Sequence, residues 1–366
     1  AITVTVGEIF NCFEYISSNG ITVVNGAPIT YDGSYYVRIV DYYGNVAEVD
    51  IVIDSVAPSY ELLGVSNGGS TAGRVILSWD SADAAKACLV DRNNNIISDS
   101  IVSGAAYDDE GAYYVRLTDI CDNSVLISFN IDKSVSYTAD IVDKQVTTDK
   151  VTFKFNEAAE ITVTRDGEQV SGLAFSDIGA YRLVAVDAVG NTAAVDFYII
   201  SRAYREFNYS FPDGSAIVGA TIGGQAIDIH ASGADVRLSV SGDYALSLSS
   251  PNGQAYILSF AVDNIAPTAD MIEDEDGSIT IGNFNKDNLS VQLFKDGESV
   301  SYQIGDAISS HGDYTVVISD TLGNTSTYQF TIPYRLNAMS IAAIVIGVVA
   351  VIVIVAIIIA KRKIKS

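Results

Sequence analysis

The chain has 366 residues and a formal net charge of −24, from 21 Lys and Arg against 45 Asp and Glu. A surface this acidic argues against DNA and RNA as partners, because phosphate binding needs patches of Lys and Arg. Three cysteines and two histidines offer neither a disulfide framework nor the spacing of a metal site, so we expect no cofactor.

The first clear element is a β-strand with a tight turn in the segment 33–45. Tyr35, Val37 and Ile39 fall on one face of this strand at a period of two residues. The turn that follows contains Asp, Gly and Asn. Asp can bond its own backbone, and Gly and Asn tolerate a positive φ, so a second strand is expected after the turn.

The same pattern occurs five times along the chain. Each copy starts with Gly-x-Tyr and continues with apolar residues at alternate positions. In the fourth copy Ser250 and Gln254 replace the Asp and Asn of the turn. A period of roughly 60–80 residues predicts an array of similar small domains. The tyrosines that mark the copies are Tyr35, Tyr113, Tyr181, Tyr244 and Tyr314.

Each copy is also preceded by a two-residue hairpin signal. Such pairs favour type I′ turns, whose twist matches the flanking strands. Short strands at regular spacing, with no amphipathic helix between them, predict β-sandwiches. The turn pairs are Asn25-Gly26, Asn94-Asn95, Asp166-Gly167, Gly223-Gly224 and Asp296-Gly297.

The predicted domain boundaries follow the last strand of each copy. Pro58, Pro267 and Pro333 lie at such boundaries, where Pro ends strand pairing and stiffens the connection. No Gly/Ser-rich linker separates the copies, so we expect a semi-rigid row, extending on the order of 150 Å. The predicted repeats cover residues 1–58, 59–134, 135–200, 201–267 and 268–334.

The segment 338–360 is apolar apart from Ser340 and carries no charge. Its length fits a membrane span, which needs about 20 apolar residues. The basic segment 361–366 follows directly, and positive flanks stay in the cytosol. We therefore expect a single-pass protein of the cell membrane, with the lipid bilayer as a partner, an extracellular N-terminal region and a cytoplasmic tail. Because the sequence starts at Ala1 without an export signal, we interpret it as a processed or truncated form.

The Gly-x-Tyr-x-[Val/Leu] element resembles the tyrosine corner of immunoglobulin-like (Ig-like) sandwiches. The resemblance implies a structural role for the five tyrosines. In antibody domains a Cys follows two residues after the Tyr, whereas here Val or Leu does, so the inter-sheet disulfide is absent. The Asp-x-x-Gly-Asn turns and Ile-Asp-x-x-Ala-Pro junctions look like the bacterial Ig-like domains of Gram-positive surface proteins. They imply an all-β tandem array of about five small Ig-like β-sandwiches, followed by one transmembrane α-helix. No Leu-Pro-x-Thr-Gly motif precedes the span, so the span itself is the expected anchor.

Acidic residues at the predicted joints are candidates for Ca²⁺ binding. Ca²⁺ takes six to eight oxygen ligands, whereas the sequence places only one or two acids at each joint, so the interpretation without metal is favoured. The Asp residues of the turns are interpreted as caps of their own hairpins. Cys88 and Cys121 lie in one repeat, and their pairing stays open. The Ca²⁺ candidates are Asp54, Asp132 and Asp263.

No nucleophile motif or phosphate loop is present, so we expect no enzyme activity. The favoured function is a membrane-anchored cell-surface stalk or spacer, structural and adhesive, that displays a more N-terminal functional region. The alternative is an adhesin whose repeats themselves bind carbohydrate or host protein. Tyr36 and Tyr114, the second tyrosines of their copies, could contribute to such a surface, although aromatic residues are also common in strands for packing alone.

Overall fold

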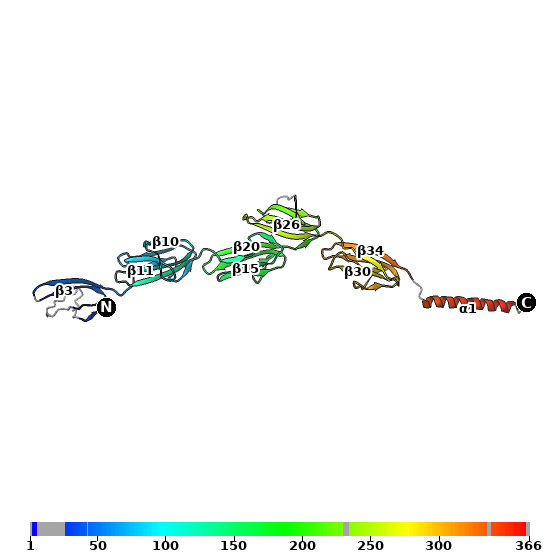
Figure 1. The fold of residues 1–366 in the computed structure, drawn as a ribbon, viewed down its shortest axis with the longest axis horizontal. Helices are drawn as coiled ribbons and strands as arrows, with labels where there is room; N and C mark the ends of the chain where they lie inside the picture. The colour runs from blue at the N-terminus through cyan, green and yellow to red at the C-terminus, as the bar shows by residue number, and fades with distance from the viewer. Residues whose placement is uncertain (1, 6–25, 42, 230–233, 335–337, 364–366) are drawn as a thin grey trace.

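The computed structural model describes residues 2–5, 26–41, 43–229, 234–334 and 338–363. These residues form β-strands in small sheets and one C-terminal helix. The strands group around five hydrophobic cores along an elongated molecule, and the helix lies at its far end (Figure 1). This confirms the predicted fold class, an all-β array of Ig-like sandwiches followed by one apolar helix. We call the five groups of strands domains 1 to 5.

Domain 1 is described in part. Its strands β3 and β4 form the predicted hairpin, with Tyr35 opposite Ile51 and Val37 opposite Val49. Asn25 and Cys12 lie outside the described residues. The strands are β1 (Ile2–Thr3), β2 (Pro28–Ile29), β3 (Gly33–Val40) and β4 (Val46–Ile53).

Domain 2 pairs a five-stranded sheet, β6-β12-β11-β8-β9, with a three-stranded sheet, β10-β7-β5. Cys88 and Cys121 are both free thiols, so no disulfide links them. The strands are β5 (Tyr60–Leu63), β6 (Ser70–Thr71), β7 (Val75–Trp79), β8 (Lys86–Val90), β9 (Ile96–Ser98), β10 (Ala105–Tyr107), β11 (Gly111–Thr118) and β12 (Ser124–Ile131).

Domain 3 repeats this arrangement with sheets β14-β20-β19-β16-β17 and β13-β15-β18. Its Asp166-Gly167 turn has φ values of 52° and 87°, as a type I′ hairpin requires. The strands are β13 (Tyr137–Ala139), β14 (Gln145–Thr147), β15 (Val151–Phe155), β16 (Ala159–Arg165), β17 (Glu168–Val170), β18 (Ala174–Phe175), β19 (Gly179–Asp187) and β20 (Thr192–Ile199).

Domain 5 has sheets β31-β30-β33-β34 and β28-β29-β32. Alternate side chains of β33, Tyr314, Val316 and Ile318, are buried in its core. This is the period of two residues that the sequence pattern predicts. The strands are β28 (Asp270–Glu273), β29 (Ile279–Gly282), β30 (Ser290–Lys295), β31 (Glu298–Val300), β32 (Ala307–Ile308), β33 (Gly312–Ser319) and β34 (Thr325–Ile332).

Domain 4 differs in its second sheet. Among the described residues, β22 pairs only with β25, whereas β7, β15 and β29 of the other domains each pair with two strands. No strand in the described part of domain 4 therefore takes the place of β5, β13 or β28, the first strands of the other second sheets. The strands are β21 (Ala203–Tyr204), β22 (Phe207–Ser210), β23 (Ala216–Ile222), β24 (Gln225–Ile227), β25 (Asp235–Leu238), β26 (Gly242–Ser249) and β27 (Ala255–Val262).

Domain 3 contributes to the core of domain 4. Val146 of β14 belongs to the same buried cluster as Phe207, and Tyr198 of β20 packs against that cluster. Burial in this interface raises the pKa of Tyr209 well above its ordinary value. Figure 1 shows the two domains side by side, not end to end, so the predicted row has one lateral step. There is a physical reason for this step. The side of domain 4 that its second sheet leaves uncovered is apolar, and packing against domain 3 removes that surface from water.

The helix α1 (Ala338–Lys363) contains the segment Met339–Lys361, which has a mean hydropathy of 3.5 and is exposed along its length. By length and composition it could cross a membrane. The helix continues through Lys361 to Lys363, so the basic residues extend its last turn and do not end it.

Candidate functional site

The five tyrosines of the repeated pattern share one contact. Each phenolic hydroxyl donates a hydrogen bond to the backbone carbonyl oxygen four residues earlier, at 2.8 or 2.9 Å. Each ring of the last four also stacks on a Phe of the next strand, with ring centroids 4.8 to 5.6 Å apart. Their structural role stays a prediction. It can be tested by removing the hydroxyl group and measuring the stability of the domain. The acceptors are the carbonyls of Tyr31, Asp109, Asp177, Val240 and Ser310.

In the four domains whose turn contains Asp and Asn, these two residues form a closed hydrogen-bonded unit. In domain 3, Oδ1 of Asp187 accepts from the backbone N–H groups of Val189 and Asn191, and Oδ2 accepts from the amide of Asn191 at 2.7 Å. Burial raises the pKa of the Asp187 carboxyl, but these hydrogen bonds outweigh that effect and hold the pKa below its ordinary value. The turn is thus an Asx cap of its own hairpin, as the sequence favours.

The same Asn also links two domains. Its amide nitrogen donates a second hydrogen bond, 2.8 Å long, to the backbone carbonyl of the junction Asp that ends the preceding domain. We call this contact the joint lock. It occurs at three joints, as Asn123 to Asp54, Asn191 to Asp132 and Asn324 to Asp263.

The joint between domains 3 and 4 has a different structure. Domain 4 carries Ser250 and Gln254 where the lock needs Asp and Asn. Here Arg202 of the connection donates to the carbonyl of Thr148, and the Thr148 hydroxyl donates to the carbonyl of Ser259. The loss of the turn residues therefore coincides with the side-by-side arrangement of these two domains.

At the joint between domains 2 and 3, three carboxylates meet. Asp132 of the junction, Glu157 of the β15–β16 loop and Asp187 of the turn place oxygen atoms within 4.8 Å of one another. Three carboxylates could supply part of the oxygen set that Ca²⁺ requires. Sequence reasoning named Asp132 as a Ca²⁺ candidate and interpreted Asp187 as the cap of its own hairpin. Glu157 is the member of the cluster that sequence reasoning missed, because only folding brings the loop that carries it to the joint.

At the joint between domains 4 and 5, a lysine takes the corresponding place. The ammonium of Lys286 lies 2.7 Å from Asp263 and 2.8 Å from Asp320. Burial lowers the pKa of Lys286, but the hydrogen bonds to Asp263 and Asp320 outweigh it and hold the pKa above its ordinary value. The candidate Asp263 is thus neutralised by the protein's own cation. Asp54 caps the backbone N–H of Val56 and belongs to no cluster of three metal-ligating side chains among the described residues.

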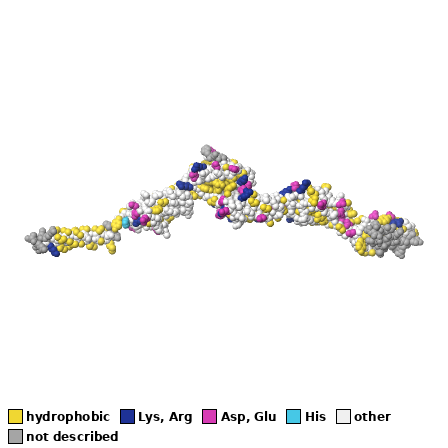
Figure 2. Space-filling model, turned by 180° about the vertical axis from the view of Figure 1, so that it is seen from behind, with side chains coloured by type: hydrophobic (Ala, Val, Ile, Leu, Met, Phe, Trp, Pro, Cys, Tyr) yellow, Lys and Arg dark blue, Asp and Glu magenta, His cyan; other side chains and the backbone are white. Residues whose placement is uncertain are grey.

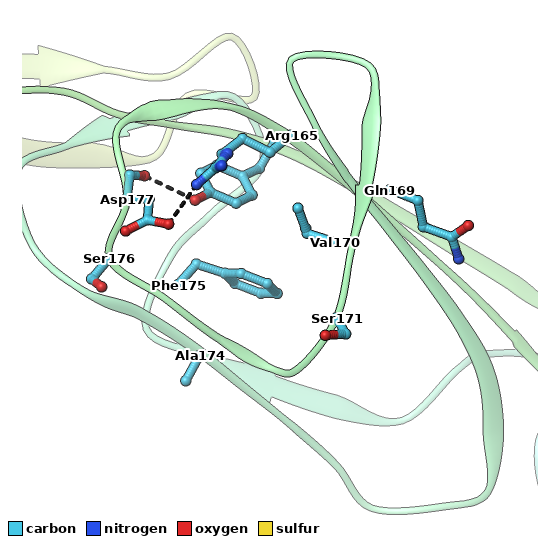
Figure 3. A pocket seen from close by; sticks show the side chains of 9 residues that line it. Arg165, Gln169, Val170, Ser171, Ala174, Phe175, Ser176 and Asp177 are labelled. Carbon is cyan, nitrogen blue, oxygen red and sulfur yellow. Dashed lines mark hydrogen bonds and ion pairs between the residues drawn. The ribbon is translucent and has the colours of Figure 1, made fainter.

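Two further cavities lie between edge strands. Figure 3 shows the one in domain 3, about 580 Å³ in volume, where Phe175 forms the floor between β17 and β18. Arg165 crosses this cavity and pairs with Asp177 at 2.5 Å. A cavity of about 380 Å³ occupies the same place in domain 5, beside Lys295. The charged groups of the first cavity already satisfy one another, and no Cys or His lines either cavity.

Comparisons with known proteins give similarity in structure only. No family model matches the chain, and no curated protein matches it. Among solved structures, the eight N-terminal Ig domains of Down Syndrome Cell Adhesion Molecule are similar over 85% of this chain, at 11% identity and a TM-score of 0.26. This chain covers 52% of that one, about half its length.

Two other solved structures are tandem Ig arrays as well. Sidekick-1 immunoglobulin domains 1–5 match 76% of this chain and 79% of their own, at 12% identity and a TM-score of 0.23. A three-Ig structure of titin domains I67–I69 matches 55% of this chain and 99% of its own, at 11% identity and a TM-score of 0.22. At these TM-scores the similarities carry no argument about function. The fold is therefore described from the strand pairing of this chain, and the function is inferred from its own residues.

Proposed function

We propose that this chain is a membrane-anchored stalk on the surface of a Gram-positive bacterium, which holds a more N-terminal functional region away from the cell. The observation that carries this proposal is the row of Ig-like sandwiches that ends in one apolar helix (Figure 1). The bacterial origin is inferred from the Asp-x-x-Gly-Asn turns and the Ala-Pro junctions of the sequence.

The joints support a spacer function. Three of the four connections carry the joint lock, which ties the turn of one domain to the end of the domain before it. The fourth shares a hydrophobic core. Both devices restrict bending, which is what a spacer needs to keep its tip at a distance.

The surface chemistry fits an exposed, hydrated position. Figure 2 shows Asp and Glu side chains spread along the domains and hydrophobic side chains along the C-terminal helix. Excess negative charge keeps such a surface soluble and discourages association between copies. The basic residues at 361–363 favour a cytoplasmic tail, with residues 1–334 outside. We infer no catalytic role.

The anchor and its orientation can be tested with two epitope tags on the full chain. One tag is inserted in the exposed turn at Asn252-Gly253, and the other follows Ser366. On intact cells we expect antibody to reach only the first tag, and to reach the second after permeabilisation. A chain that ends at residue 337 serves as the control and should be released into the medium. A tail tag that is accessible on intact cells would contradict the proposal.

The second candidate function is an adhesin, in which a repeat binds its own ligand. It is favoured by a polar hollow on domain 2, which has no counterpart of the same chemistry in domain 3.

A further inference from the structure

A hollow of about 320 Å³ lies on the outer face of the five-stranded sheet of domain 2. Its lining comes from four elements that are far apart in the sequence. The loop before β6 contributes Gly68, the β8–β9 turn contributes Arg92, β11 contributes Tyr114, and β12 contributes Ser128 and Asn130. We call these five residues and the space between them the domain 2 hollow.

One wall of the hollow is held rigidly. The backbone N–H of Gly68 donates to the carbonyl of Ser128 at 2.7 Å, and the N–H of Ser128 donates to Oδ1 of Asn67 at 2.8 Å. The N–H of Asn130 donates to the carbonyl of Gly69 at 3.0 Å. A wall fixed by three hydrogen bonds loses little conformational freedom on binding, which favours affinity.

Domain 3 shows what the same place looks like when it is filled. There the N–H of Lys144 donates to the carbonyl of Asp196, as Gly68 does to Ser128. The Asp196 side chain forms an ion pair with Arg182, which occupies the strand position equivalent to Tyr114 of domain 2. Tyr198 occupies the position of Asn130 and packs against domain 4. Domain 2 therefore has Gly68 where domain 3 has Lys144, Tyr114 and Ser128 where domain 3 has the ion pair, and Asn130 where domain 3 has Tyr198. Gly, Ser and Asn are smaller than Lys, Asp and Tyr, which leaves room for the hollow beside Tyr114.

The charge of the hollow is opposite to that of the chain. Arg92 is exposed and forms no ion pair within the described part of the chain, and no carboxylate side chain lines the hollow. In a chain with 45 acidic and 21 basic residues, this local excess of positive charge selects for an anion. A guanidinium binds a carboxylate through two parallel hydrogen bonds, which favours a planar acidic group.

The remaining groups favour a saccharide as the carrier of that carboxylate. The half-buried ring of Tyr114 offers an apolar face together with a polar hydroxyl, and Asn130 offers both a donor and an acceptor. A pyranose has apolar C–H faces and a belt of hydroxyl groups, which match these two features. The volume lies at the lower limit of small-ligand sites, roughly 300–1,000 Å³, and fits one or two sugar units.

We propose that the domain 2 hollow binds an acidic saccharide, whose carboxylate is held by Arg92 and whose ring lies against Tyr114. This inference rests on the adhesin candidate and is independent of the membrane anchor. In domain 3, which has the same topology, the corresponding face packs against domain 4 through Tyr198.

The test measures binding of glucuronate oligosaccharides and of matched glucose oligosaccharides to the full chain in lipid nanodiscs. We expect the acidic form to bind and the neutral form to bind more weakly. Arg92→Gln should lower the affinity for the acidic form by about 10- to 100-fold, since it removes a charge-assisted contact. Asn130→Tyr copies the residue of domain 3 and should abolish binding by filling the hollow. Leu126→Tyr is the matched control, because Leu126 lies on the same face of β12 and is 50% exposed.

Three outcomes would overturn the inference. No binding by the unmodified chain excludes the site and leaves the stalk proposal intact. Binding that is equally strong in Arg92→Gln and Asn130→Tyr shows an adhesin that uses a different surface. Self-association of the chain that Asn130→Tyr strengthens, without saccharide binding, shows that this face docks protein, as it does in domain 3.

Discussion

Replacement of Lys286 by Met removes the only protein cation that links domains 4 and 5 among the described ion pairs. The ammonium lies 2.7 Å from Asp263 and 2.8 Å from Asp320. The side chains of Lys286 and Asp320 are only 17% and 7% exposed, so water compensates poorly for the loss. The variant leaves two carboxylates without their counter-charge at the joint.

The expected loss of stability can be worked out from the pKa of the Asp320 carboxyl group. Burial raises its pKa, but hydrogen bonds from Lys286 and Asn324 outweigh burial and lower the pKa from 3.8 to about 2. That difference corresponds to at most about 2 kcal/mol. Asn324 supplies part of it and solvent screens the rest, so we expect Lys286→Met to lower the free energy of unfolding of domain 5 by about 1–2 kcal/mol at pH 7.

The effect should depend on pH in a defined way. Because the pKa of Asp320 is lower in the folded state, its contribution is present above about pH 4 and is lost as the pH falls toward 2. The pKa of Lys286 is raised on folding, so its contribution is present below its ordinary pKa of 10.5 and is lost at higher pH. The difference between the two proteins should therefore be full at pH 7 and small at pH 2.

The assay is urea unfolding of the full chain at each pH, followed by a brief deuterium pulse and mass spectrometry of peptides from β33 and β34. Arg237→Met is the control, because its ion pair with Glu206 is exposed (72% and 45%) and should contribute less than about 1 kcal/mol. An unchanged unfolding midpoint of domain 5 at pH 7, or a loss of equal size at pH 2, would refute the electrostatic account of this joint.

Three further changes test the joint between domains 2 and 3 and the role of the tyrosines. Asn191→Ala removes the joint lock to Asp132, so we expect a broader distribution of distances between spin labels on domains 2 and 3, and a cost of about 1 kcal/mol in domain 3. An unchanged distribution would show that the lock does not restrict the joint. Glu157→Lys places a positive charge beside Asp132 and Asp187, as Lys286 does at the joint between domains 4 and 5. It should raise the free energy of unfolding of domain 3 by about 1 kcal/mol at low salt and by less at high salt, and a decrease would contradict this. Tyr181→Phe removes the hydrogen bond to the carbonyl of Asp177 and should cost about 1 kcal/mol in urea unfolding, whereas no change would reject the structural role of the tyrosines.

Much of the fold could be predicted because it depends on local patterns. A period of two residues sets which side chains of a strand face the core, and Asp, Gly and Asn set the turn. Each marker Gly accordingly pairs with an Ile or Val twenty residues later, in one antiparallel register for all five domains. The pairs are Gly33 with Ile53, Gly111 with Ile131, Gly179 with Ile199, Gly242 with Val262 and Gly312 with Ile332.

The lateral step between domains 3 and 4 could not be predicted in the same way. Among the described residues it coincides with β22 having one strand partner where β7, β15 and β29 have two, and a strand that is not there leaves no local pattern in the sequence. The substitutions Ser250 and Gln254 were visible in the sequence. Their meaning depends on the joint lock, which is a contact between residues about 60 positions apart.

The sequence by itself determined the strands, the turns, the apolar helix and the junction Asp residues, because each depends on neighbours along the chain. Only the tertiary structure decided what surrounds those Asp residues. Asp132 meets Glu157, whereas Asp263 meets Lys286, although both belong to similar junctions. The deciding side chain comes from a loop more than twenty residues away, and only folding places its charge beside the junction.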